Sequence, residues 1–322
     1  MNSKRLDALL AQISQLHMAV IGDFALDFYF DINPDSSEIS VETGKKVHIC
    51  QNPKAYLGGA GNVAKNLANL GVQVDAFGIQ GNDLFGREMS HQAEKWHIST
   101  EHLLTIEDLN TPTYSKPMRA NEEQNRLDFG TRSAHFQQHA TTLIQQLQKQ
   151  IDNYQWVIIN EQFRLPLLNK QSLGLLQNLV GEKAIADLRS LGNEANQTLL
   201  KVNEIEVTKI IGEITNLQEQ IKSWALQRNK PVLVTLGEKG MIYASPTEFH
   251  WEKAIPVRGP IDTVGAGDMV VAAFSAAKAT GASIEEACEF ASLAVHISIQ
   301  KIGETGSANP QEIKQLHHAN GN

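Results

Sequence analysis

The sequence predicts an α/β fold in which a mainly parallel sheet is covered by helices on both faces. Short apolar runs that read as buried strands alternate with longer segments of helical periodicity, and this alternation is typical of such sheets. The clearest buried strand is the run from Pro231 to Leu236. No repeat, linker or low-complexity tract divides the 322 residues, so we expect a single domain over 1–322.

The elements of the N-terminal half follow in order. Residues 1–17 place leucines at helical spacing among charged residues and lack the uninterrupted apolar core of a signal peptide, so they predict an amphipathic helix. The apolar runs beyond it predict strands, and the segments between them predict helices. The expected order is a strand at 18–23, a helix at about 59–70, a strand at 74–80, a helix at 83–96, a strand at 156–160 and a helix at 167–179.

The C-terminal half continues the same pattern. After two more strands and a helix, the 231–236 strand precedes two β-forming runs that suggest a small antiparallel edge. The expected order is strands at 184–187 and 199–203, a helix near Glu204, strands at 231–236, 241–244 and 249–257, a helix at 269–277 and a last helix near Glu312.

Two segments, Phe28 to Tyr56 and Thr111 to Gly130, interrupt the alternation. Both are rich in polar and β-forming residues and show no helical period, so we expect extended excursions from the sheet edge that together form a lid. Long insertions of this kind often cover an active site. The alternative is a pair of surface insertions with no such role.

Composition and charge limit the classes of partner. A net charge of −8, a pI near 5.8 and the lack of a basic stripe argue against nucleic acid, so any bound anion must be met by local cations. No apolar stretch approaches the length of a membrane span. Cys50 and Cys288 form no metal-ligand or redox spacing and read as packing residues of a reduced protein. We therefore expect a cytoplasmic protein with a small-molecule substrate.

The segment from Asp262 to Asp268, Asp-Thr-Val-Gly-Ala-Gly-Asp, leads directly into an apolar helix. Amides at a helix N-terminus lack partners within the helix and carry partial positive charge, so Gly265, Ala266 and Gly267 can cradle a phosphate. Asp268 would then lie where a carboxylate can take the proton of an attacking hydroxyl. The pattern predicts a small-molecule kinase site; the alternative is an ordinary glycine-rich turn.

A second glycine-rich segment, Gly58 to Asn62, opens the helix expected at about 59–70. Glycine lets a ligand approach the backbone, and the Asn62 amide offers both a donor and an acceptor to a hydroxylated molecule. Asp23 and Asp27 bracket the end of the first strand, at the sheet edge where such folds bind ligands. The expected substrate-binding residues are Gly58, Gly59, Asn62, Asp23 and Asp27.

Together these motifs resemble the ribokinase-like, or pfkB, family of sugar kinases. Gly58 to Asn62 fits the family's N-terminal signature, and Asp262 to Asp268 fits its C-terminal signature. Between them, 203–206 fits the Asn-x-x-Glu motif and 235–240 fits the turn on the nucleotide side. The resemblance covers nearly the whole chain and implies a ribokinase-like three-layer α/β/α sandwich with a mainly parallel central sheet and a small β-strand lid. The nucleotide-side residues that it implies are Asn203, Glu206, Thr235, Gly237 and Gly240.

The resemblance also implies direct, in-line transfer of the ATP γ-phosphate to a sugar hydroxyl. Asp268 takes the role of base, and the amides of residues 265–267 stabilise the transferring phosphoryl group. Mg²⁺ is implied at the nucleotide phosphates, held through water by Glu206, and a monovalent cation such as K⁺ is implied beside Asp262 and the Val264 carbonyl. A homodimer formed through the lid is the assembly that the resemblance implies.

Within the family the likeness is greatest to the kinases of D-glycero-D-manno-heptose 7-phosphate. Residues 22–27 resemble their opening strand and turn, and 125–129, Asn-Arg-Leu-Asp-Phe, resembles their lid segment. Arg119 and Arg126 are then expected as lid cations, because a guanidinium grips a phosphate through two parallel hydrogen bonds. The alternative for both is a solvated strand face.

The chain also departs from the heptose kinases. It has Asn160 to Arg164 where they carry Asp-Tyr-x-Lys-Gly, and 187–189, Asp-Leu-Arg, where they carry Asp-Pro-Lys. The sugar, and whether it already bears a phosphate, therefore stay open. Because the chain ends soon after the helix near Glu312, we expect no nucleotidyltransferase domain of the bifunctional heptose enzymes.

Three other functions are alternatives to a sugar-phosphate kinase. A kinase of a neutral sugar or nucleoside remains open, as does a non-catalytic sugar- or nucleotide-binding regulator, although a regulator has no need to keep Asp268 between its glycines. A dinucleotide-binding oxidoreductase is disfavoured, because no Gly-x-Gly-x-x-Gly follows the first strand. Lys301 and Glu304 read as solvated surface residues.

Overall fold

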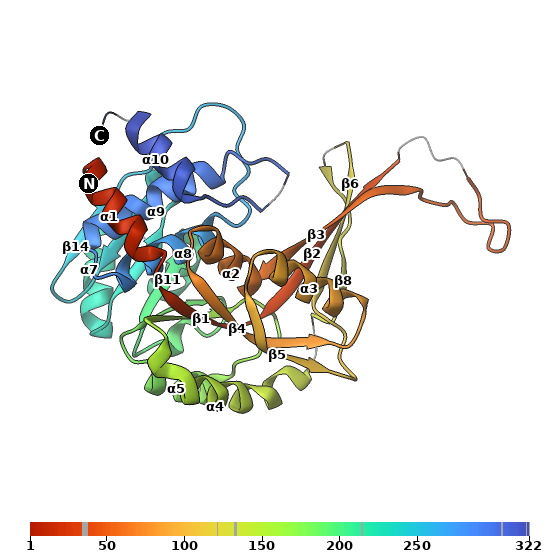
Figure 1. Ribbon diagram of the computed structural model, residues 1–322, viewed down its shortest axis with the longest axis horizontal. Helices are drawn as coiled ribbons and strands as arrows, with labels where there is room; N and C mark the ends of the chain where they lie inside the picture. Colours follow the sequence, from red (N-terminus) through yellow and green to blue (C-terminus); the bar gives the residue numbers. More distant parts are fainter. Residues whose placement is uncertain are drawn as a thin grey trace.

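The chain forms three layers, with a nine-stranded sheet between two sets of helices and a separate five-stranded sheet at one side (Figure 1). This computed structural model describes residues 1–33, 38–120, 122–131, 134–213, 215–303, 305–319 and 321. The architecture confirms the predicted α/β/α sandwich with a mainly parallel sheet. Among the described helices, none combines the length and apolar character that crossing a membrane requires.

The nine-stranded sheet is parallel except at one edge, where β13 pairs antiparallel with both β12 and β14. The predicted antiparallel edge is therefore confirmed, although its last strand ends at Glu252 rather than Val257. In spatial order the strands are β14 (Phe249–Glu252), β13 (Met241–Ala244), β12 (Val232–Thr235), β11 (Leu199–Asn203), β10 (Ala184–Leu188), β9 (Trp156–Glu161), β1 (His17–Gly22), β4 (Gln73–Gly81) and β5 (Ser99–Ile106).

Two separate apolar cores hold the helices to opposite faces of this sheet. On one face lie α1 (Ser3–Ile13), α2 (Ala60–Asn69), α3 (Leu84–Lys95), α8 (Ala266–Ala279), α9 (Ile284–Ser298) and α10 (Pro310–Ala319). On the other face lie α4 (Ala140–Gln150), α5 (Lys170–Val180), α6 (Glu204–Ile211) and α7 (Leu217–Arg228). Short 3₁₀ turns occupy Ala134–His139, Ile151–Asn153, Gly192–Glu194 and Gly237–Lys239. The strand β5 and the helices α4, α7 and α9 were not predicted from the sequence.

The two predicted lid segments form the smaller sheet. Its order is β3 (Cys50–Gly59), β2 (Phe24–Ile32), β6 (Thr113–Arg119) and β7 (Glu122–Glu123), with β8 (Leu127–Phe129) also paired to β6. The pairing of β2 with β6 is parallel and joins the two segments. The lid begins at Phe24, slightly earlier than predicted, and beyond it the chain extends as a long arm away from the body (Figure 1). Residues 34–37 and 121 of the predicted lid lie outside the described residues.

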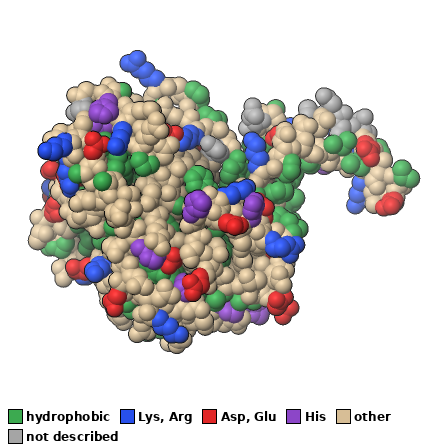
Figure 2. Space-filling model, in the orientation of Figure 1, with side chains coloured by type: hydrophobic (Ala, Val, Ile, Leu, Met, Phe, Trp, Pro, Cys, Tyr) green, Lys and Arg blue, Asp and Glu red, His purple; other side chains and the backbone are tan. Residues whose placement is uncertain are grey.

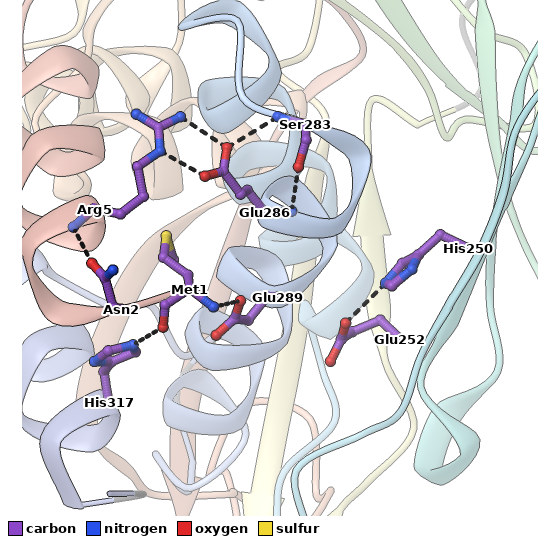
Figure 3. Close-up of polar contacts among 9 residues, drawn as sticks. All are labelled: Met1, Asn2, Arg5, His250, Glu252, Ser283, Glu286, Glu289 and His317. Carbon is purple, nitrogen blue, oxygen red and sulfur yellow. Dashed lines mark hydrogen bonds and ion pairs between the residues drawn. The ribbon is translucent and has the colours of Figure 1, made fainter. Parts of the chain in front are cut away.

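The predicted N-terminal amphipathic helix is α1, and it packs against α10 and α8. Arg5 reaches across to α9 with a two-pronged ion pair, Nε 2.6 Å and Nη2 2.8 Å from the two carboxylate oxygens of Glu286 (Figure 3). Glu286 also accepts from the Ser283 backbone in a capping box at the start of α9. The Arg5 hydrogen bond and the Ser283 amide lower the pKa of Glu286 to about 2.

One of the two cysteines departs from expectation. Cys288 is buried in α9, as a packing residue should be, but Cys50 is exposed. The expectation was wrong for Cys50 because β3 starts on the solvated arm, where its first residues face solvent. On the face drawn in Figure 2, acidic and basic side chains are interspersed and form no continuous basic stripe.

Candidate active site

The turn at 262–268 lies between two hollows of the molecule. The smaller, about 200 Å³, lies under the lid and is lined by Gly265 and Asp268; we call it the acceptor hollow. The larger, about 710 Å³, is lined by Ala266 and Gly267 and extends along the edge of the sheet; we call it the nucleotide hollow. One short turn therefore contributes to both.

Asp268 lies in the first turn of α8 and is held by two side-chain amides. Its Oδ2 accepts from Asn62 Nδ2 at 2.6 Å, and its Oδ1 accepts from Gln162 Nε2 at 3.3 Å. Burial, and to a lesser extent the charge of Asp187, raises the pKa of Asp268 to about 6. Asn62, Lys201 and Gln162 act in the opposite direction and lower it. The carboxylate is thus ionised at neutral pH and is basic enough to take a proton.

The two glycines of the turn differ in how much space surrounds them. Gly265 has φ +78°, and a Cβ there would lie 2.4 Å from Thr305 Cγ2 and 2.8 Å from Asn62 Nδ2. At Gly267 a Cβ would lie 3.0 Å from Lys201 Nζ. The Ala266 amide donates to the Thr263 carbonyl at 3.2 Å, so this expected phosphate donor is engaged within the turn. The amides of the next two residues lie in the first helical turn, where helix geometry gives them no acceptor.

Lys201 is a functional candidate that the sequence analysis missed. It lies on β11 and is 6% exposed, with Nζ 3.2 and 3.3 Å from the two carboxylate oxygens of Asp187. Burial opposes its charge, but Asp187, Glu206 and Asp268 together raise the pKa of Lys201 above its ordinary value. A cation therefore lies directly under the turn. A lysine within an otherwise apolar strand, Leu199 to Val202, was the available signal.

The acceptor hollow collects cations from both the lid and the body. Lys116 Nζ lies 2.9 Å from Asp27 Oδ1 and donates to the Tyr29 hydroxyl at 2.9 Å. Arg126 binds both oxygens of Asp128, at 2.7 and 2.9 Å, and lies 4.5 Å over the Tyr114 ring.

Arg189 completes this set of cations. It comes from the loop after β10, and its Nη1 donates to the Gln162 carbonyl at 3.3 Å. Five residues that were not predicted as site residues from the sequence also line the hollow: Lys116, Arg189, Gln162, Tyr114 and Thr305.

Of the predicted substrate residues, Asp27, Gly59, Asn62 and Arg126 line the acceptor hollow. Gly58 lies beside it, since a Cβ there would come within 3.0 Å of Asp27 Oδ2. Arg119 does not join them, because it lies at the far end of β6, where its backbone is in register with Glu122 of β7.

Asp23 requires a correction. It is 2% exposed, and its two oxygens accept the backbone N–H groups of Gln162, Phe163 and Leu167 at 2.7–2.8 Å. This geometry does not fit contact with a sugar hydroxyl. Asp23 instead fixes the loop after β9, which positions Gln162. Burial raises the pKa of Asp23 to about 6, because its effect is larger than the opposing effect of these three hydrogen bonds.

Thr235, Gly237 and Gly240, the residues that the resemblance implies on the nucleotide side, line the larger hollow. Asn203 and Glu206 form a capping box at the start of α6, in which Glu206 Oε2 accepts from the Asn203 amide at 2.8 Å. Glu206 Oε1 then remains as a carboxylate oxygen suited to a metal-bound water.

Two cation sites are expected near the turn, one for Mg²⁺ and one for a monovalent cation. In the part of the chain that the structure describes, no three His, Cys, Asp or Glu side chains are grouped to hold a metal. Asp262 accepts from the amides of Val264 and Gly303, at 3.0 and 3.2 Å, and so stabilises the loop expected to hold a monovalent cation. Lys301 donates to the Ser307 carbonyl at 2.6 Å and so differs from the expected solvated residue, whereas Glu304 lies outside the described residues.

Comparison with known proteins gives a family match and related folds. A model described as pfkB family carbohydrate kinase matches residues 15–312. Bifunctional protein HldE of Coxiella burnetii (strain Dugway 5J108-111) is 29% identical over 306 residues, 93% of this chain and 63% of that protein. HldE of Haemophilus influenzae (strain PittEE) is 28% identical over 316 residues, 96% of this chain and 65% of that protein. The chain thus spans a little under two thirds of these relatives.

Solved structures share the fold at low identity. Arabidopsis thaliana ribokinase, complexed with ribose and ATP, superposes with a TM-score of 0.71 at 19% identity, covering 94% of this chain and 98% of that one. Escherichia coli phosphofructokinase-2, in complex with potassium, gives 0.72 at 17% identity, covering 95% and 99%.

Proposed function

The chain belongs to the pfkB family of carbohydrate kinases, and we propose that it transfers the γ-phosphate of ATP to a hydroxyl of a sugar phosphate. The observation that carries this proposal is the turn shared by the two hollows. A nucleotide on one side and a hydroxyl acceptor on the other would meet at Asp268. In-line transfer requires this arrangement of donor, acceptor and base.

Asp268 acts as the general base in this proposal. The acceptor oxygen forms a bond to the γ-phosphorus while the bond between that phosphorus and the ADP oxygen breaks, and the hydroxyl proton passes to the Asp268 carboxylate. Asn62 and Gln162 orient the carboxylate by donating to its two oxygens. A non-catalytic regulator would not need a base held in this way.

The turn and Lys201 stabilise the charge on the transferring group. The amides at 267 and 268 point from the first turn of α8, and the Lys201 ammonium lies beneath Gly267. Asp187 keeps that ammonium charged and in place. Bound Mg²⁺, held through water by Glu206, supplies further neutralisation of the nucleotide phosphates.

The cations of the acceptor hollow favour a substrate that already carries a phosphate. Lys116 and Arg126 each have a carboxylate partner, Asp27 and Asp128, whereas the hydrogen bond described for Arg189 goes to a neutral carbonyl. Arg189 is therefore available to a phosphate dianion, which a protein of net charge −8 would otherwise repel. This supports the resemblance to heptose 7-phosphate kinases, with a neutral sugar or nucleoside as the alternative acceptor.

Four further features belong to this proposal. We propose that residues 1–322 act as one domain, that K⁺ binds beside Asp262 and the Val264 carbonyl, that two copies pair through the lid, and that the protein works in the cytoplasm. The potassium complex of phosphofructokinase-2 supports the second of these. Leu127 and Phe129, exposed apolar side chains of β8, support the third.

An ATP-consumption screen tests the function directly. Sugars and their phosphates, including heptose 7-phosphate, are assayed side by side with the wild type and with Asp268→Asn as the inactive control. We expect turnover of a sugar phosphate that the variant loses. Turnover of unphosphorylated sugars alone would favour the neutral-sugar alternative, and no ATP consumption with any acceptor would favour a regulator.

A further inference from the structure

A third hollow lies beside the segment that contains Ser307, two residues after Thr305 of the acceptor hollow. It encloses about 480 Å³ between α2, α3 and the segment that precedes α10, and its lining includes Lys65, Lys95, Lys301, Trp96, Asn69 and Ser307. The charged side chains among the described residues that line it are three lysines, one of which, Lys301, is ion-paired with Glu312 at 2.8 Å. We call it the basic hollow.

Two of these lysines hold one short segment of the chain. Lys65 Nζ donates to the Thr305 carbonyl at 2.6 Å, and Lys301 Nζ donates to the Ser307 carbonyl at 2.6 Å. Lys65 is 5% exposed and lies 5.8 Å from the centroid of the Trp96 ring. The position of residues 305–307 therefore depends on ammonium groups that line the basic hollow.

The same segment forms part of the acceptor hollow. Thr305 lines that hollow and lies against Gly265, where an added Cβ would come within 2.4 Å of the Thr305 methyl. Lys65 follows the acceptor-site residue Asn62 by one helical turn on α2. A shift of Thr305 would thus reach both the turn and the space for the acceptor.

We propose that the basic hollow binds a small phosphate-bearing anion and that the bound anion weakens binding of the acceptor. A phosphate oxygen is a stronger acceptor for an ammonium group than a peptide carbonyl, because the hydrogen bond is assisted by charge on both sides. The anion competes with the Thr305 carbonyl for Lys65, and with the Ser307 carbonyl and the Glu312 carboxylate for Lys301. Lys95 supplies a third cation from the last turn of α3. The free energy that couples the two sites is reciprocal, so the acceptor weakens anion binding equally.

Calorimetry tests the binding without any turnover. Pyrophosphate is titrated into protein saturated with a non-hydrolysable ATP analogue and Mg²⁺, so that the phosphate-binding turn is already occupied. We expect one site in the wild type, weakened about tenfold in Lys95→Glu because an attractive contact becomes repulsive. Lys149→Glu, the same charge change at the exposed end of α4 on the opposite face of the sheet, should bind as the wild type does.

Kinetics then test the coupling. Pyrophosphate should raise the KM for the acceptor and leave the KM for ATP unchanged, and Lys95→Glu should lose this effect while keeping wild-type activity without pyrophosphate. Equal inhibition of the wild type, Lys95→Glu and Lys149→Glu would place the anion in the active site and overturn the proposal. Absence of calorimetric binding below about 10 mM would overturn it as well. The calorimetric result does not depend on which sugar is the acceptor, so it is separate from the proposed function.

Discussion

Asn62 Nδ2 lies 2.6 Å from Asp268 Oδ2, although 206 positions separate the two residues in the sequence. The hydrogen bond joins the first turn of α2 to the first turn of α8, and the two helices pack against each other. Because Oδ2 is occupied by this short bond, Oδ1, with its longer 3.3 Å contact to Gln162, is the oxygen better placed to take a proton. The orientation of the proposed base is thus set by both glycine-rich motifs together.

Replacement of the base is the first test. Asp268→Asn should keep the fold and the affinity for ATP but lower kcat by roughly 10²–10⁴-fold, the usual contribution of general-base catalysis. Steady-state kinetics give kcat, and calorimetry gives the Kd for ATP. Asn62→Ala, which keeps the carboxylate but removes its short hydrogen bond, should lose less. Near-normal turnover in Asp268→Asn would rule out the assignment.

The pKa of Asp268 predicts the acid side of the pH profile. Because that pKa is raised to about 6, kcat should fall as the pH drops below about 6 and the carboxyl becomes protonated. Lys201 lowers this pKa, so Lys201→Met should move the acid limb to higher pH, whereas Lys201→Arg keeps the charge and should move it little. The measurement is kcat against pH for the three proteins. An acid limb at the same pH in all of them would show that Lys201 does not act on Asp268.

The space at Gly267 predicts a graded response. A Cβ at this position would meet only the flexible end of Lys201, at 3.0 Å, so Gly267→Ala should lose little kcat/KM. The branched side chain of Gly267→Val would occupy the approach of the phosphate and should lower kcat/KM strongly. Circular dichroism checks that both variants fold. An unchanged kcat/KM in Gly267→Val would mean that the turn does not touch the phosphoryl group.

The cations of the acceptor hollow predict selectivity for a phosphorylated acceptor. Arg126→Ala and Arg189→Ala should each raise the KM for the sugar phosphate by about ten- to a hundredfold, since a charge-assisted contact contributes about 1.5–3 kcal/mol and each factor of ten in affinity corresponds to about 1.4 kcal/mol. The KM for ATP should not change. Arg126→Lys should recover part of the loss, because it keeps the charge without the planar fork. Arg119→Ala, outside the hollow, is the matched control, and an effect of equal size there would contradict this map of the site.

The ion pair between Arg5 and Glu286 predicts a pH-dependent stability. The folded pKa of Glu286, about 2, lies below its ordinary value of 4.5, so the contribution is present above pH 4.5 and is lost as the pH falls towards 2. Arg5→Met should lower Tm by about 1–3 °C at neutral pH, as expected for one partly exposed pair in a chain of this size. The difference from the wild type should disappear near pH 2. Lys4→Met, an exposed neighbour on the same helix, should leave the Tm unchanged at both pH values.

The parts of the site that follow from local backbone requirements could be predicted from the sequence. Gly265, with its φ of +78°, sits where the backbone favours glycine, and the glycine-rich turn before an apolar helix made both Gly265 and Gly267 visible in the sequence. Asp23 was misassigned because the amides that occupy it come from residues about 140 positions away.

Lys116 and Arg189 were not predicted for the same reason: their partners are distant in the sequence. Lys116 meets Asp27 only because β6 pairs in parallel with β2, and Arg189 reaches the hollow only because β10 lies beside β9. Strand periodicity reports which side chains are buried, but it does not report which strands are neighbours. Lys116 and Arg189 can therefore be placed in the site only when the order of strands in the sheets is known.

The parallel pairing of β2 with β6 also bears on the order of folding. Leu26 pairs with Thr113, so the chain between them, which contains β3, β4 and β5, must be organised before the lid can close this long loop. The nucleotide hollow, by contrast, is lined by residues between Thr235 and Ile299, a much shorter stretch of chain. We therefore expect refolding molecules to acquire nucleotide binding before they acquire acceptor binding.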